Sequence, residues 1–110
     1  MESININFLV SGTEITIPFS AICSITDKKF EGIIIIEYHP NKKVLEYVNA
    51  EKVIKNVCKK KLTVEELAYE IFKRAKESIS PKYLKILVDV HKSDAHQPVQ
   101  VWIEKIFKRR

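Results

Sequence analysis

Glycine is scarce in this sequence, and its scarcity excludes two large classes of nucleotide-binding protein. The chain of 110 residues contains only Gly12 and Gly32. Neither lies in a glycine-rich loop of the kind that P-loop and Rossmann proteins use to hold phosphates. We therefore expect no nucleotide site of either kind.

Cysteine is also rare, and long apolar runs are absent. Cys23 and Cys58 are too few for a disulfide framework, and they fit no zinc-ligand spacing. No apolar run approaches the ~20 residues of a membrane span, and the polar, acidic amino terminus is unlike a signal peptide. We expect a cytoplasmic protein with no membrane contact, folded as a single domain over residues 1–110.

Positive charge is what the sequence has in excess. The net charge is +5, and the basic residues are clustered as Lys28-Lys29, Lys42-Lys43, Lys59-Lys60-Lys61 and the tail Lys105, Lys108, Arg109 and Arg110. Clusters of this kind are typical of proteins that bind a polyanion through its phosphates. The alternative is a solvated surface on a lysine- and isoleucine-rich chain, and charge alone does not decide between the two.

Alternating apolar residues predict strands at both ends of the chain. Ile4 to Val10 alternates with a period of two, and Ile15 to Phe19 continues the pattern after the turn signal Ser11-Gly12, which predicts a hairpin. Pro18 is then expected at the end of its strand or on a sheet edge. Further strands are predicted over Gly32–Tyr38, where the isoleucine run indicates burial on both faces, and over Tyr83–Val90 and Val99–Phe107.

Two helices are predicted between these strands. Val48 to Cys58 forms a short helix, and its expected apolar side is Val48, Val53, Ile54 and Val57. The second helix is better defined, because Thr63 and Glu66 form a capping box and Ser80-Pro81 ends the segment. Its apolar stripe is Leu67, Ala68, Ile71, Phe72, Ala75 and Ile79. Strands, two helices and strands in this order predict an α+β domain.

Cys23 is the leading candidate for chemistry. It follows the amphipathic segment Glu14–Phe19 and opens the polar turn Cys23–Lys29. A thiol near lysines and hydroxyls can be held partly as the thiolate, which is the nucleophilic form. The alternative is a small buried apolar residue, and the polar neighbours argue against it. Cys58, at a helix end beside a lysine run, is interpreted as structural.

Glu65 is the second candidate. The capping box uses Glu66, so Glu65 is free to contact a ligand; the alternative is a surface acid favoured by the helix dipole. Trp102 is expected in the core or at a subunit interface.

The three histidines, His39, His91 and His96, match no metal-ligand spacing. Ordinary polar loop residues are the simpler interpretation. A catalytic pair of Cys23 with one of these histidines remains open.

The stretch from Phe19 to Glu104 resembles the QueF family of the tunnelling fold. The matching residues are Cys23-Ser24-Ile25-Thr26, the run from Ile36 to Glu46, Glu65, and Ser80-Pro81-Lys82-Tyr83. The family includes nitrile reductases of 7-cyano-7-deazaguanine and short archaeal QueF-like amidinotransferases, which act on the same base inside transfer RNA. The resemblance implies an antiparallel β-sheet with two helices on one face, in subunits that form a homo-oligomeric ring, a pentamer or decamer, with sites at the interfaces.

The resemblance also implies residue roles. Cys23 would attack the nitrile to form a covalent thioimide, and Glu65 would read the guanine-like edge of the base. The reductases follow the Glu46 position with a Ser-Lys-Ser type segment for NADPH; Tyr47-Val48-Asn49 stands there in this chain, which favours the amidinotransferase branch.

One family position is not matched. The family carries an aspartate proton donor seven residues after the cysteine, where this chain has Phe30. We assign Asp27 to that role and place His96 among the substrate-binding residues.

These observations predict an archaeosine synthase-type amidinotransferase. Its partners would be transfer RNA containing 7-cyano-7-deazaguanine and ammonia or an amine donor, and it would need neither cofactor nor metal. Two alternatives remain: an NADPH-dependent reductase of the free base, and a non-catalytic RNA- or base-binding protein.

Overall fold

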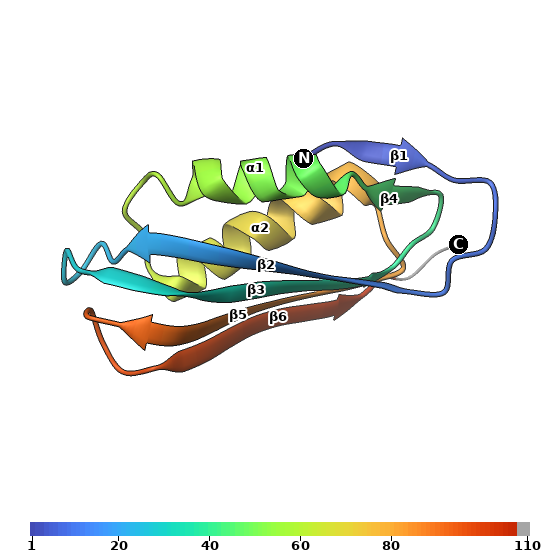
Figure 1. Cartoon of the computed structure of the whole chain (residues 1–110). Coiled ribbons are helices and arrows are strands. Elements are labelled where there is room, and N and C mark those ends of the chain that lie inside the picture. Colours follow the sequence, from blue (N-terminus) through green and yellow to red (C-terminus); the bar gives the residue numbers. More distant parts are fainter. Residues whose placement is uncertain (108–110) are drawn as a thin grey trace.

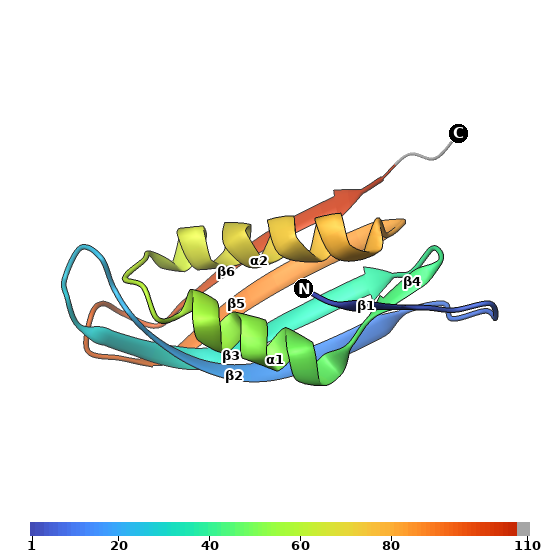
Figure 2. The same ribbon diagram turned by 90° about the horizontal axis from the view of Figure 1, so that it is seen from above.

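Two helices cover one face of an antiparallel sheet in the computed structural model, which describes residues 1–107 (Figure 1). The sheet is built, in spatial order, from β2 (Thr13–Ile22), β3 (Lys29–His39), β5 (Tyr83–Ser93) and β6 (Val99–Ile106). Seen from above, α1 (Tyr47–Val57) lies over β2, and α2 (Val64–Ile79) lies over β5 and β6 (Figure 2). The predicted α+β architecture, with both helices on one face, is confirmed.

The amino-terminal hairpin predicted from the sequence is wrong. The first strand, β1 (Ser3–Asn5), pairs instead with β4 (Lys43–Leu45) in a separate two-stranded sheet. Beyond Asn5 the alternating apolar side chains have no surface to pack against: Phe8 is 67% exposed and Leu9 is 88% exposed. The second predicted strand is longer than expected, and Pro18 lies within it on the edge strand of the sheet, a position where proline is tolerated.

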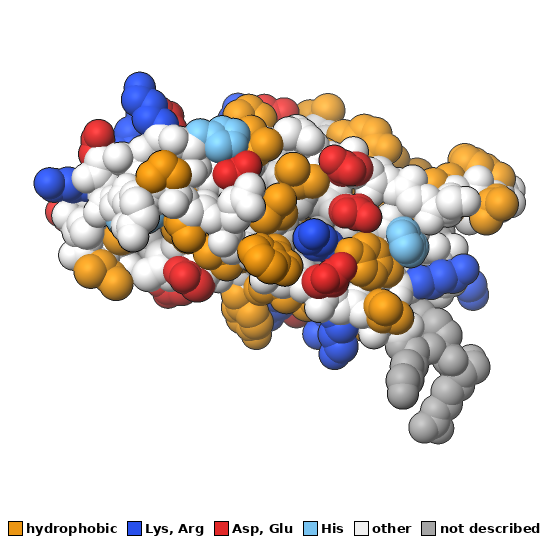
Figure 3. Space-filling view, turned by 90° about the horizontal axis from the view of Figure 1, so that it is seen from below, with side chains coloured by type: hydrophobic (Ala, Val, Ile, Leu, Met, Phe, Trp, Pro, Cys, Tyr) orange, Lys and Arg blue, Asp and Glu red, His pale blue; other side chains and the backbone are white. Residues whose placement is uncertain are grey.

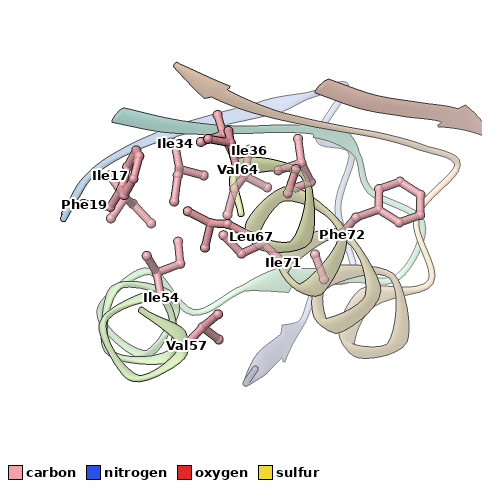
Figure 4. Packing of buried hydrophobic residues seen from close by; sticks show 14 of the residues in the cluster. Ile17, Phe19, Ile34, Ile36, Ile54, Val57, Val64, Leu67, Ile71 and Phe72 are labelled. Carbon is pink, nitrogen blue, oxygen red and sulfur yellow. The ribbon is translucent and has the colours of Figure 1, made fainter. Parts of the chain in front are cut away.

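The core fills the space between the sheet and the helices. Ile17 and Phe19 of β2 and Ile34 and Ile36 of β3 face Ile54 and Val57 of α1 and Leu67 and Ile71 of α2 (Figure 4). Every residue of the stripe predicted for α2 is buried. In α1 the prediction is partly wrong, because Val48 is exposed and Ala50 is buried in its place.

The opposite face of the sheet carries mixed apolar and charged side chains (Figure 3). Adjacent strands place Ile35, Leu87 and Trp102 in one row across this face. Trp102 is 57% exposed, so it does not lie in the core, because its neighbours on β6 turn toward the helices and it turns away. The other expected place, a subunit interface, stays a prediction. The isoleucine run of β3 is likewise only half-buried at Ile33 and Ile35.

The predicted capping box at the start of α2 is confirmed. The Glu66 amide donates to Thr63 Oγ1 at 3.1 Å, and the Thr63 amide donates to Glu66 Oε1 at 2.9 Å. That backbone hydrogen bond from Thr63 lowers the pKa of the Glu66 carboxyl.

Neither helix in the described part of the chain is long and apolar enough to cross a bilayer.

A register shift near the end of the sheet depends on Gly32. Gly32 pairs with Val90 and Glu31 pairs with Lys92, so β5 carries one extra residue, His91, at this point. A Cβ at Gly32 would lie 1.9 Å from the carbonyl oxygen of Asp89. The extra residue reverses which side chains of β5 lie on the core face of the sheet. Ser93 is thereby paired with Phe30, whose side chain is buried in the core.

Gly32→Ala should therefore destabilise the protein by about 2 kcal/mol or more, because the new methyl group collides with backbone and not with a flexible side chain. The free energy of unfolding is measured by urea titration at one fixed protein concentration. Gly12→Ala is the matched control, since its Cβ would meet nothing closer than 3.5 Å. Equal stability of the two variants would contradict the close approach at Gly32.

Candidate active site

A pocket at one end of the sheet gathers three of the four site residues predicted from the sequence. Its volume is about 270 Å³, and its lining residues are Cys23, Ile25, Thr63, Val64, Glu65, His96, Gln97 and Val99. They come from the turn after β2, the first turn of α2 and the connection from β5 into β6. Cys23, Glu65 and His96 are thus brought together from segments far apart in the chain.

Backbone hydrogen bonds join two of these segments. The Leu62 amide donates to the Ile22 carbonyl at 3.1 Å, and the Ser24 amide donates to the Leu62 carbonyl at 3.3 Å. Leu62 is buried, and the next residue is the N-cap of α2. The cysteine after β2 therefore lies beside the amino terminus of a sixteen-residue helix, where the helix dipole favours negative charge.

The Cys23 thiol lies among hydrogen-bond donors. Backbone N–H groups of Thr26 and then Ile25, and after them the Thr26 hydroxyl, lower the pKa of Cys23, while burial and the negative charge of Glu65 act to raise it. The sequence predicts that nearby lysines and hydroxyls stabilise the thiolate; in the structure, backbone amides contribute most of this effect and the Thr26 hydroxyl adds to it. The side chain is buried, as the apolar alternative predicted, yet its sulfur is surrounded by groups that stabilise a thiolate.

Cys58 has the opposite environment. It lines a separate cavity of about 490 Å³ between β2 and α1. Burial raises the pKa of the Cys58 thiol to about 11, so this larger cavity offers no thiolate at neutral pH. Of the two thiols, the one in the smaller pocket is therefore the one whose thiolate is favoured.

Glu65 is exposed, and it is not used by the capping box, which engages Glu66. Glu65 lines the pocket of Cys23 and also a neighbouring cavity of about 400 Å³ that includes Lys60 and Lys61. An ionised acid here can accept hydrogen bonds from a ligand in the pocket.

Asp27 does not line the pocket. Its backbone is left-handed, with φ 65°, and its amide donates to the Cys23 carbonyl at 2.9 Å. Its carboxylate forms an ion pair with Lys61. Asp27 closes the turn that carries Cys23, and its position gives no support to the proton-donor role predicted for it.

His96 is half-buried at the wall of the pocket. Its ring packs on Phe30, with 5.7 Å between ring centroids, and its Nδ1 lies 2.8 Å from the Gln97 carbonyl oxygen. Ser93 Oγ accepts from the amides of Ala95 and His96, both at 3.0 Å, and so fixes the turn.

The other two histidines lie outside the pocket. His91 pairs with Asp89 at 2.9 Å, and the His39 ring packs on Tyr83. Of the cysteine–histidine pairs left open by the sequence, the structure brings together only Cys23 and His96. Within residues 1–107 no three His, Cys, Asp or Glu side chains are grouped as metal ligands.

Sequence reasoning missed the donors that act on Cys23 and the partner that orients His96. The Thr26 and Ile25 amides carry no signal in the sequence, because every residue has a backbone amide. In the sequence, Phe30 stands out only as a departure from the family pattern, and its burial in the core is seen only in the structure.

Comparison with known proteins supports the fold. No family model matches the chain. The structure is similar to the crystal structure of the archaeosine synthase QueF-Like in the apo form, with a TM-score of 0.79 over 88% of this chain and 95% of that chain. The sequences are 22% identical, so the likeness is one of fold. At that level the resemblance seen in the sequence is confirmed.

The two thiols should titrate far apart. Since hydrogen bonds lower the pKa of Cys23, its alkylation by iodoacetamide should reach half its maximal rate at a lower pH than that of an ordinary exposed cysteine. Cys58 should require a pH near 11. Mass spectrometry of peptides labelled across a pH series measures both, with Cys58→Ala and Cys23→Ala identifying each signal. A Cys23 midpoint above that of a free thiol would contradict the role of the turn amides.

Proposed function

We propose that this chain is an amidinotransferase that converts the nitrile of 7-cyano-7-deazaguanine in transfer RNA to the amidine of archaeosine. One observation carries the proposal: Cys23, whose thiolate the turn amides favour, and Glu65 line one pocket. The fold shared with the archaeosine synthase QueF-Like gives this pairing its context. Cys23 acts as nucleophile, and Glu65 reads the base.

The reaction needs only a thiolate, proton transfers and ammonia. The sulfur of Cys23 attacks the nitrile carbon, one carbon–nitrogen π bond breaks, and the nitrogen takes a proton to give a covalent thioimide. Ammonia then adds to the same carbon and loses a proton. The carbon–sulfur bond breaks, the thiolate of Cys23 leaves, and the amidine is released. Nitrile and ammonia sum to amidine with no electron gained or lost, so no redox cofactor enters.

The pocket suits a single base. Its volume of about 270 Å³ is near the lower limit of ligand sites, which is ~300 Å³. Ile25, Val64 and Val99 supply apolar walls, and Glu65 supplies an acceptor for the N–H donors of a guanine-like edge. Ile25 is 81% exposed, and we propose that a neighbouring subunit in a ring covers this side, pairing at the exposed edges β2 and β6.

Exposed lysines beside the pocket are compatible with transfer RNA as the partner. Lys59 and Lys60 are exposed immediately before α2, and Lys28 lies in the turn of Cys23. Cations beside a base pocket can hold the phosphates on either side of a base turned out of its stack. The basic tail Lys108, Arg109 and Arg110 lies outside the described residues.

Replacing Cys23 should abolish the covalent adduct, whereas replacing Glu65 should weaken reversible binding of the base. Intact mass after mixing with 7-cyano-7-deazaguanine should show a covalent adduct on the wild-type protein and none on Cys23→Ala, which should still bind the base reversibly. Glu65→Ala should weaken that binding by about 1–3 kcal/mol, because a donor edge loses its acceptor.

Cys58→Ala is the matched control and should form the adduct as the wild type does. Adduct formation by Cys23→Ala, or consumption of NADPH with the substrate, would sink the proposed mechanism. Unchanged affinity of Glu65→Ala would make Glu65 a surface acid without a role in binding.

Transfer RNA binding should depend steeply on salt, and part of that dependence should come from the lysines beside the pocket. Replacing Lys59 and Lys60 with alanine should reduce the slope of log affinity against log salt by about 1 for each phosphate that the variant no longer neutralises. Lys61 is left in place because it pairs with Asp27. Binding is measured by fluorescence anisotropy over a salt series.

The control for this experiment is the pair Lys42→Ala and Lys43→Ala. These exposed lysines lie past the far end of β3, on the order of 33 Å from the pocket. Equal slopes for the two double variants would assign Lys59 and Lys60 to solvated surface.

A further inference from the structure

We propose that His96 is the proton donor for the addition step: its imidazolium gives a proton to the nitrile nitrogen while Cys23 attacks the carbon. This inference rests on the proposed function and adds to it the group that completes the reaction. It replaces Asp27 as the acid and changes the role of His96 from binding the substrate to acting on it.

The titratable side chains that line the pocket are Cys23, Glu65 and His96. Cys23 is consumed as the nucleophile. Glu65 must stay ionised to accept hydrogen bonds from the base, and an ionised carboxylate has no proton to give. The hydroxyl of Thr63 is held by the Glu66 amide in the capping box. His96 remains: its imidazolium can donate a proton, and it lines the pocket.

The hydrogen bond of Nδ1 decides which nitrogen reacts. A carbonyl oxygen can only accept, so Nδ1 carries a hydrogen in its 2.8 Å contact with the Gln97 carbonyl, whether the ring is neutral or charged. The proton that comes and goes is therefore on Nε2. Packing on Phe30 and the hydrogen bonds of Ser93 hold the ring and its turn in place, as an acid that acts at a fixed point requires.

The proton balance closes over both half-reactions. Nε2 gives its proton to the nitrile nitrogen as the carbon–sulfur bond forms and one carbon–nitrogen π bond breaks. The neutral ring then accepts the proton that the attacking ammonia loses, and the carbon–sulfur bond breaks to release Cys23 as the thiolate. His96 ends each turnover protonated, as it began.

This sequence of steps predicts how adduct formation depends on pH. The rate should fall at low pH as the Cys23 thiolate is lost, and at high pH as the His96 imidazolium is lost. The titratable side chains that share the pocket with the ring are Cys23 and Glu65, and Asp94 lies two residues before it in the same connection. The β3 side presents Phe30, which is apolar.

The test compares His96→Gln with two controls. His91→Gln changes a histidine on the neighbouring strand that is paired with Asp89 outside the pocket, and Asp27→Asn changes the rival acid. The rate of adduct formation with 7-cyano-7-deazaguanine is followed by intact mass between pH 5 and 10. Reversible affinity for the base is measured with each change placed in the Cys23→Ala background, where no adduct forms.

His96→Gln should slow adduct formation by about 10²–10⁴-fold, abolish the decline at high pH, and leave reversible affinity within a few-fold of the Cys23→Ala parent. His91→Gln and Asp27→Asn should keep the wild-type rate and profile. His96→Asn gives a second side chain at the position, and thermal unfolding checks that every variant is folded.

Adduct formation by His96→Gln at the wild-type rate would overturn the inference, and so would an equal loss in Asp27→Asn. A loss of reversible affinity that matches the loss of rate would return His96 to substrate binding. These results are distinct from failure of the proposed function itself, in which the wild-type protein forms no adduct at any pH.

Discussion

The site depends on a short backbone connection between the end of β2 and the residue before α2. Leu62 donates to Ile22 and accepts from Ser24, and its buried side chain anchors this connection in the core. Because of these two hydrogen bonds, a thiol in the turn after β2 and an acid in the first turn of α2 share a pocket, although 42 positions separate Cys23 from Glu65 in the sequence. No interaction between the two side chains themselves is needed to bring them together.

The register shift at Gly32 positions the third segment of the pocket, which is the connection from β5 into β6. Without the extra residue in β5, the strand would pair Lys92 with Phe30 on the core side; with it, Ser93 takes that place. The Ser93 hydroxyl then holds the turn in which His96 packs on Phe30. A close backbone approach that leaves no room for a side chain at Gly32 thus determines where an imidazole lies.

Much of this fold could be predicted because its helices carry strong local signals. The capping box of α2 and its stripe from Leu67 to Ile79 depend only on neighbours within the helix. The Ile4–Val10 segment failed because alternation shows that residues are apolar, but not that a surface exists to receive them. Cys23 and Glu65 could be singled out by resemblance. The donors on the Cys23 thiol could not, since most are backbone amides whose direction is set by the turn. The position of Asp27 outside the pocket could not be foreseen either, because nearness in sequence does not say which way a carboxylate points.

The three segments that form the pocket all lie where strands and helices end, while the buried residues of the sheet and helices lie behind them. The exposed residues of these segments, such as Ile25 and Glu65, can therefore change without altering the packing of the core, whereas Cys23 and Val64 are part of it. In evolutionary terms, an acid lost from one loop can be replaced from another without rebuilding the domain, provided that the new group reaches the same point in space.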